Sequence, residues 1–141
     1  MKTKRFALLG LITALIILVG VTTETRSLFA GGPQKAPKEH RVHIKKMKNK
    51  WRVVDGQDSA STLVKASKGD NIVWKALGSD VFLQFGDSTV FGTHNAVIKT
   101  GQNLTLTVLP TAAPGRYPYA AFCVKDNEFA TGDSPPVIII Q

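Results

Sequence analysis

Beyond residue 50 the apolar and polar side chains alternate with a period of two, which is the pattern of β-strands. Leu104, Leu106 and Val108 form one such face, and the stretch from Tyr117 to Cys123 forms another. Gly, Pro, Asn and Asp separate the alternating stretches, as they do at turns. We therefore predict strands over residues 51–54, 61–66, 71–76, 81–85, 96–99, 104–109, 117–123 and 137–140. No stretch after residue 30 has helical periodicity, so the fold class is all-β, a sandwich or barrel.

The N-terminus has a different pattern, with Lys2, Lys4 and Arg5 followed by residues 6–21 without a charge. A basic start followed by an apolar run is typical of a secretory signal peptide. The run also reaches the lower length limit for a membrane-spanning helix if residues 22 and 23 are added. Residues 1–30 are therefore either a cleaved signal peptide or an N-terminal anchor through residues 6–23. Both alternatives place the remaining chain in the periplasm or outside the cell, and the type of envelope stays open.

Positive charge is concentrated between residues 35 and 52, where eight Lys and Arg accompany one acid, Glu39. Residues 53–141 carry six basic and eight acidic side chains. We predict a basic linker or arm over residues 31–50, with a short edge strand at 40–44, and a sandwich domain over 51–141. The arm either docks on anionic lipid head groups, envelope polymers or an acidic partner, or is simply a solvated segment. The candidate interaction residues are Lys45, Lys46, Lys48 and Lys50, with Asp126, Asn127 and Glu128 in a later loop.

Two motifs resemble those of a known family. Residues 64–74 read VKASKGDNIVW, and residues 115–119 read GRYPY. They are similar to the strand entry and the Gly-x-Tyr-x-aromatic strand of cupredoxins, the plastocyanin-like blue-copper proteins. The resemblance covers roughly residues 51–141 and implies an eight-stranded Greek-key β-sandwich.

The resemblance does not carry over the copper ligands. In the family, a cysteine is followed closely by a histidine and then by a methionine. Here Cys123 is followed by VKDNEF, and no histidine or methionine occurs after it. The first histidine ligand would be expected near Ser79 and Asp80, where none stands. A type 1 copper site needs two imidazoles and a thiolate, so we expect no intact site and no cofactor.

An alternative metal site remains open from the sequence. Cys123 and His94, or Cys123 with His40 and His43, would suit copper if the fold brought them together. His40 and His43 lie three residues apart, which on a strand places them on opposite faces. The other interpretation of Cys123 is a small buried side chain.

No phosphate-binding glycine loop, nucleophile elbow or pair of catalytic carboxylates occurs in the sequence. We therefore expect no enzyme, and no nucleic-acid partner, because no recognition motif accompanies the charge. The function we expect is that of an exported cell-envelope binding module without an intact type 1 copper site. Its partner would be an envelope protein or an anionic envelope surface, contacted by loops 86–93 and 126–134 and the basic arm. The competing function is a copper carrier or electron-transfer protein.

Overall fold

The computed structural model describes residues 35–132 and 135–141, and residues 35–141 form one compact unit. The predicted signal peptide or anchor, residues 1–30, lies outside the described residues. Within the part of the chain that is described, no helix is long and apolar enough to cross a membrane.

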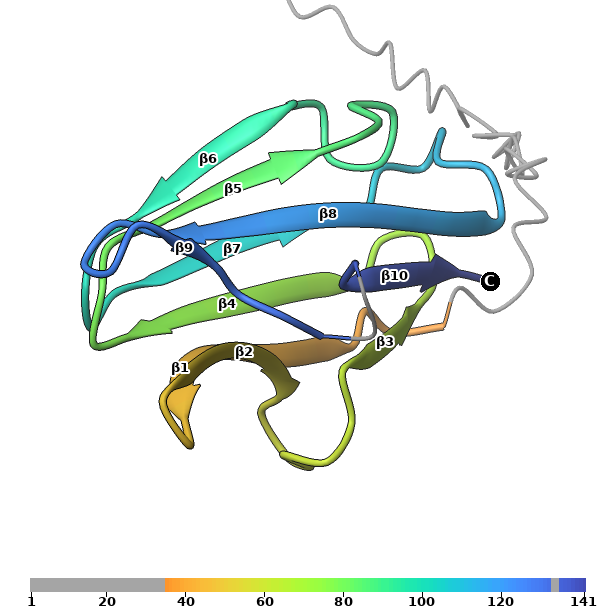
Figure 1. Ribbon diagram of the computed structural model, residues 1–141. Coiled ribbons are helices and arrows are strands. Elements are labelled where there is room, and N and C mark those ends of the chain that lie inside the picture. The colour runs from red at the N-terminus through yellow and green to blue at the C-terminus, as the bar shows by residue number, and fades with distance from the viewer. Residues whose placement is uncertain (1–34, 133–134) are drawn as a thin grey trace, which may run out of the picture. The chain divides into compact units, whose positions relative to one another are not determined.

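The described residues fold into two β-sheets (Figure 1). The first sheet has the strand order β2-β1-β4-β7, and the second has the order β3-β10-β8-β5-β6, with β9 paired to β8. The strands are β1 (Glu39–Met47), β2 (Lys50–Asp55), β3 (Leu63–Ala66), β4 (Asn71–Leu77), β5 (Val81–Phe85), β6 (Asn95–Ile98), β7 (Asn103–Thr107), β8 (Gly115–Cys123), β9 (Glu128–Phe129) and β10 (Val137–Ile140). The chain crosses between sheets after β2, β3, β4, β6 and β7. The predicted all-β Greek-key sandwich is thereby confirmed.

The core lies between the two sheets and follows the alternation of the sequence. In β4, Ile72, Trp74 and Ala76 are fully buried, while the residues between them are only partly buried. Trp74 packs against the rings of Phe85, Phe91 and Tyr119, with ring centroids 5.5 to 6.0 Å apart. Burial of such large apolar side chains is the main favourable term in folding.

Residues 39–47 correct the predicted domain boundary. They form β1, which lies between β2 and β4 in the first sheet, so they are neither a linker nor an edge strand. Val42 and Ile44 are buried in the core. The sequence obscured this strand because only two of its inward positions are apolar and charged residues surround them. The sandwich includes residues from 35 onward, not from 51.

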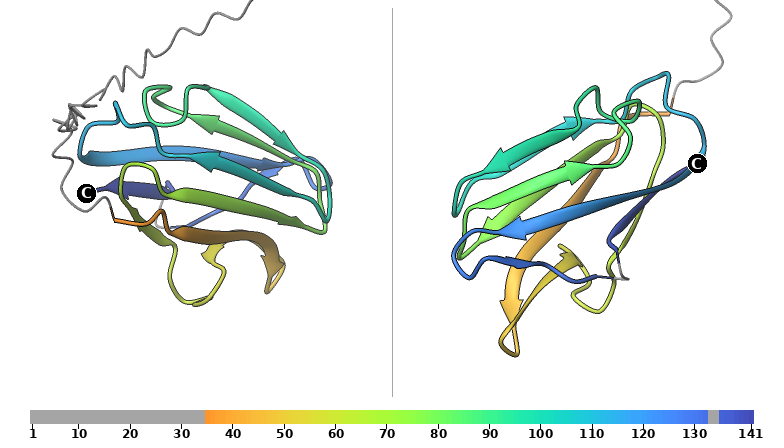
Figure 2. Two further views of the ribbon diagram at one scale, coloured as in Figure 1. Left: turned by 180° about the vertical axis from the view of Figure 1, so that it is seen from behind. Right: turned by 45° about the horizontal axis from the view of Figure 1, so that its top comes forward.

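The β1–β2 hairpin lies at the end of the sandwich opposite the start of β1 (Figures 1 and 2). Its two turn residues, Lys48 and Asn49, have φ angles of 47° and 64°. Positive φ at both central positions is the requirement of a type I′ turn, whose twist matches that of the flanking strands. This turn fixes the register that pairs Met47 with Lys50.

Loop 86–93, predicted to be exposed, is only partly so. Val90 and Phe91 are buried in the core, and the backbone N–H of Leu109 donates a hydrogen bond to the carbonyl of Val90. The loop therefore contributes to the packing of the sandwich.

Candidate anion-binding site

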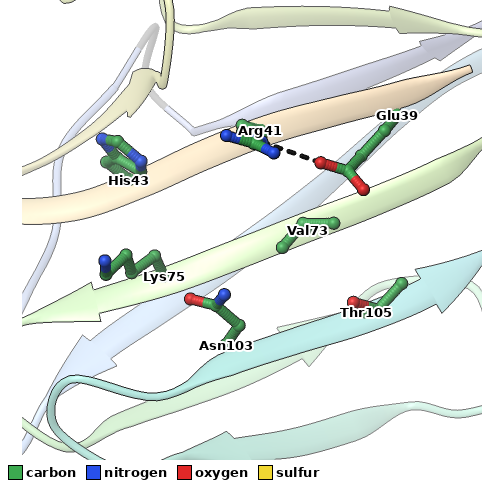
Figure 3. Close-up of a pocket in the computed structure, with 7 residues that line it drawn as sticks. All are labelled: Glu39, Arg41, His43, Val73, Lys75, Asn103 and Thr105. Atoms are coloured by element: carbon green, nitrogen blue, oxygen red, sulfur yellow. Dashed lines mark hydrogen bonds and ion pairs between the residues drawn. The ribbon is translucent and has the colours of Figure 1, made fainter.

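The outer face of the first sheet carries a polar concavity (Figure 3). Because Val42 and Ile44 of β1 point inward, the alternation of the strand places Arg41 and His43 on the outer face. The strand register then places His43 beside Lys75 of β4. Lys75 in turn lies beside Asn103 of β7. One row of the sheet thus presents an imidazole, an ammonium group and an amide to the solvent.

The next row supplies the remaining lining residues. Arg41 pairs with Val73, and Val73 pairs with Thr105. Together with Glu39, these side chains enclose a cavity of about 300 Å³. Among the described residues that line it, Glu39 is the only acid, and its Oε1 accepts a hydrogen bond of 2.7 Å from Nε of Arg41. The cavity therefore contains more positive than negative charge.

Burial and the neighbouring cations both change the pKa of His43. Partial burial lowers the pKa of His43, and the neighbouring charges of Lys45, Lys75 and Arg41 lower it further. Asp55 acts in the opposite direction, with the smallest effect. A bound anion would relieve the repulsion between these cations, and the amide of Asn103 and the hydroxyl of Thr105 are positioned to donate hydrogen bonds to it.

Two of the predicted interaction residues bind each other. Nζ of Lys46 donates a hydrogen bond of 2.7 Å to Oδ2 of Asp126, and Nε1 of Trp51 donates to the same oxygen at 2.7 Å. These contacts hold the pKa of Asp126 below its usual range. The predicted basic arm and the predicted acidic loop therefore meet at the surface of the folded unit.

The other predicted interaction residues are spread over several elements. Lys45 lies on the outer face of β1 and donates a hydrogen bond of 3.0 Å to Ser59. Lys48 and Lys50 lie at the β1–β2 hairpin. Asn127 has a φ of 52° in the turn after β8, and Glu128 begins β9. Their role in an interaction stays a prediction.

The proposed metal pair Cys123 and His94 is not formed in this structure. Cys123 pairs with Val81 at one end of β5, whereas the carbonyl of His94 accepts a hydrogen bond from the N–H of Phe85 at the other end. Four residues of extended strand separate these points by about 13 Å, far beyond the reach of a shared metal. Cys123 is also fully buried, and burial, with Asp126 and Glu128 nearby, raises the pKa of its thiol to about 12.

The arm histidines do not complete a metal site with Cys123 either. His43 lies on the outer face of the first sheet, and Cys123 lies in the core. Nε2 of His40 lies 3.0 Å from Oδ2 of the buried Asp70. The carboxylate of Asp70 also accepts hydrogen bonds from the backbone N–H groups of Lys38 and Ser67. In residues 35–132 and 135–141, no group of three or more His, Cys, Asp and Glu side chains is placed to hold a metal.

Sequence reasoning missed Arg41, Lys75, Asn103 and Thr105 as a group. The alternation of β1, β4 and β7 shows that these side chains point outward, but it does not show which strands are neighbours. The site depends on the parallel pairing of β1 with β4, which joins segments about thirty residues apart.

Comparison with known proteins gives a structural likeness only. No protein-family model matches the chain, and no curated protein matches it. Among solved structures, the chain is similar to amicyanin from Paracoccus versutus, with 13% identity, a TM-score of 0.39, and coverage of 77% of this chain and 84% of that one. A reduced amicyanin mutant gives 12% identity, a TM-score of 0.42 and coverage of 77% and 95%. An oxidized amicyanin mutant gives 18% identity, a TM-score of 0.40 and coverage of 72% and 80%. Likeness at this level concerns the fold alone and says nothing about ligands or activity.

Proposed function

We propose that this chain is an exported cell-envelope binding module, without an intact type 1 copper site, that attaches to anionic groups through the outer face of its first sheet. The observation that carries the proposal is the convergence of Arg41, His43 and Lys75 on one cavity that contains a single acid. Export rests on the charged start and apolar run of residues 1–23.

The strand register supports a binding role for this face. Lys45 of β1 lies directly opposite Arg52 of β2, and Lys75 of β4 lines the same cavity as Arg41. Like charges placed opposite each other destabilise a sheet. An anionic partner bound to this face would offset the repulsion between its cations, so the clustering of cations is consistent with a binding role.

The chemistry that this face would recognise is that of phosphate or carboxylate groups repeated along a polymer or a membrane surface. Each Lys or Arg near an anionic surface contributes about 1 kcal/mol to attachment. The contribution is screened within about 8 to 10 Å at physiological salt. Binding by this face would therefore be reversible and would weaken as salt is added.

Binding of polyphosphate, a soluble polymer of phosphate groups, tests the proposal on the full chain. Lys75→Gln should weaken the affinity about fivefold, which corresponds to about 1 kcal/mol. Lys65→Gln is the matched control, because it removes the same charge from an exposed position of β3 in the other sheet. Equal losses in the two variants would show that net charge and not this site governs binding. Vesicles with anionic or zwitterionic lipids, tested in parallel, distinguish a lipid surface from a polymer.

A further inference from the structure

The outer face of the second sheet carries an exposed apolar row across four strands. Val97 of β6 pairs with Phe82 of β5, and Phe82 pairs with Phe122 of β8. Phe122 pairs with Phe129 of β9. We call these four residues the aromatic row. Val97, Phe82 and Phe129 expose 47%, 53% and 62% of their surface.

The aromatic row is not part of the core. The alternate residues of β5, Val81 and Leu83, are fully buried and point between the sheets, so Phe82 points away from them. The ring centroids of Phe122 and Phe129 lie 5.1 Å apart. A groove of about 410 Å³ lies between Phe82, Phe122 and Phe129 on one side and the neighbouring polar residues, His94 among them, on the other. Solvent-facing strand positions are usually polar, and a contiguous apolar patch on such a face is typical of an interaction surface.

The surroundings of the aromatic row are almost neutral. On one side, Nζ of Lys99 lies 2.8 Å from Oδ2 of Asp80, so the two charges offset each other. On the other side, the adjacent row consists of Asn95, Gln84 and Ala120. The excess positive charge of the unit lies on the other sheet, at the anion-binding site. A second copy of the chain can therefore approach this face without the repulsion that it would meet at the first sheet.

We infer that the aromatic row is the centre of an interface between two copies of this chain, related by a two-fold axis that passes between Phe82 and Phe122. Such an axis reverses the row on itself, so that Phe82 of one copy packs against Phe122 of the other, and Val97 packs against Phe129. Four strands at about 4.8 Å spacing give a row of about 14 Å. A stable interface needs about 800 Å² from each copy, so the neutral row beside it would be buried as well. The anion-binding site of each copy stays exposed.

Sedimentation of the purified full chain tests the interface. We expect a dimer for the native chain and at least a tenfold weaker association for Phe82→Ser. Met47→Ser is the control, since it removes apolar surface from the other sheet. Circular dichroism and the unfolding temperature verify that both variants are folded. A monomeric native chain would overturn the inference and assign the row to another occupant, such as residues 6–21 or a different protein. Association that persists in Phe82→Ser would overturn it too.

Disulfide crosslinking tests the two-fold arrangement. A Val97→Cys copy mixed with a Phe129→Cys copy should form a mixed disulfide, whereas neither variant alone should, because the axis holds identical ends of the row about 14 Å apart. Cys123 is buried and does not interfere. Crosslinking of Val97→Cys with itself, or no crosslinking in the mixture, would contradict this pairing.

Discussion

Lys46 and Asp126 lie 80 residues apart in the sequence, yet Nζ of the first is 2.7 Å from Oδ2 of the second. The contact joins the end of β1 to the turn that follows β8. Trp51 of β2 donates to the same oxygen through its indole N–H. Residues 39–51 are therefore held in the sandwich by the strand pairing of β1 and also by the contacts of Lys46 and Trp51 with Asp126.

Removing the charge of Asp126 should be visible at Trp51. In Asp126→Asn, the indole loses its bond to a carboxylate, so we expect a shift of the Trp51 contribution to the fluorescence spectrum and a lower stability. The pKa of Asp126 is lowered in the folded state, so its stabilising effect is present above the usual carboxyl pKa and is lost as the pH falls through the folded value. The variant should therefore lose part of its stability near neutral pH and resemble the native chain at low pH. Equal differences at both pH values would contradict this account.

Truncation of a buried side chain in β1 should destabilise the whole unit. Ile44 is fully buried, so Ile44→Ala should lower the free energy of unfolding by about 2 to 5 kcal/mol, the usual cost of deleting such a side chain in a core. Denaturant unfolding measures this change. Val124→Ala is the control, because Val124 is 42% exposed, lies outside the aromatic row and should change stability by less than about 0.5 kcal/mol. If Ile44→Ala lowered the free energy of unfolding by no more than the control does, residues 39–47 would be an arm and not a core strand.

The thiol of Cys123 should resist alkylation in the folded chain. Its pKa of about 12 leaves almost no thiolate near neutral pH, and the side chain has no exposed surface. Iodoacetamide at pH 8 should therefore modify the denatured chain rapidly and the native chain very slowly, as mass spectrometry would show. Rapid labelling of the native chain would indicate an accessible thiol and reopen a role for Cys123 as a ligand.

Mutation of a neighbouring cation should change the pKa of His43. Lys75→Gln removes one of the charges that lower the pKa of His43, so that pKa should rise toward its ordinary value. A lowered histidine pKa makes folding less favourable as the pH falls from the unfolded value toward the folded one. The variant should therefore lose less stability than the native chain over this interval below about pH 6.5. NMR titration of the ring protons measures the shift, and Lys65→Gln should leave it unchanged.

Much of the fold was predictable because strands leave a strong local pattern. The alternation alone predicts the buried faces formed by residues 72, 74 and 76 and by residues 119, 121 and 123. The strand at 39–47 was not, because its two inward apolar residues stand among charged neighbours and only its pairing with β4 reveals its central place.

The candidate site was far less predictable than the fold. Lys45 and Lys46 were found as cations, but adjacent strand residues point to opposite sides, and the two have different partners. The lining residue Lys75 could not be connected to His43 without the strand order. Such a site depends on which distant strands pair and in which register, and a single sequence does not show either.

The most direct measurement is the pKa of His43 in the full chain, with and without polyphosphate. A bound anion would offset the cations of Arg41, Lys45 and Lys75, so the account predicts that the pKa of His43 rises when the polymer is added and that Lys75→Gln reduces the effect. The ring signals of His94, which immediately precedes β6 of the other sheet, serve as an internal control and should keep their positions. No change at His43, or equal changes at His43 and His94, would contradict the assignment of this face as an anion-binding site.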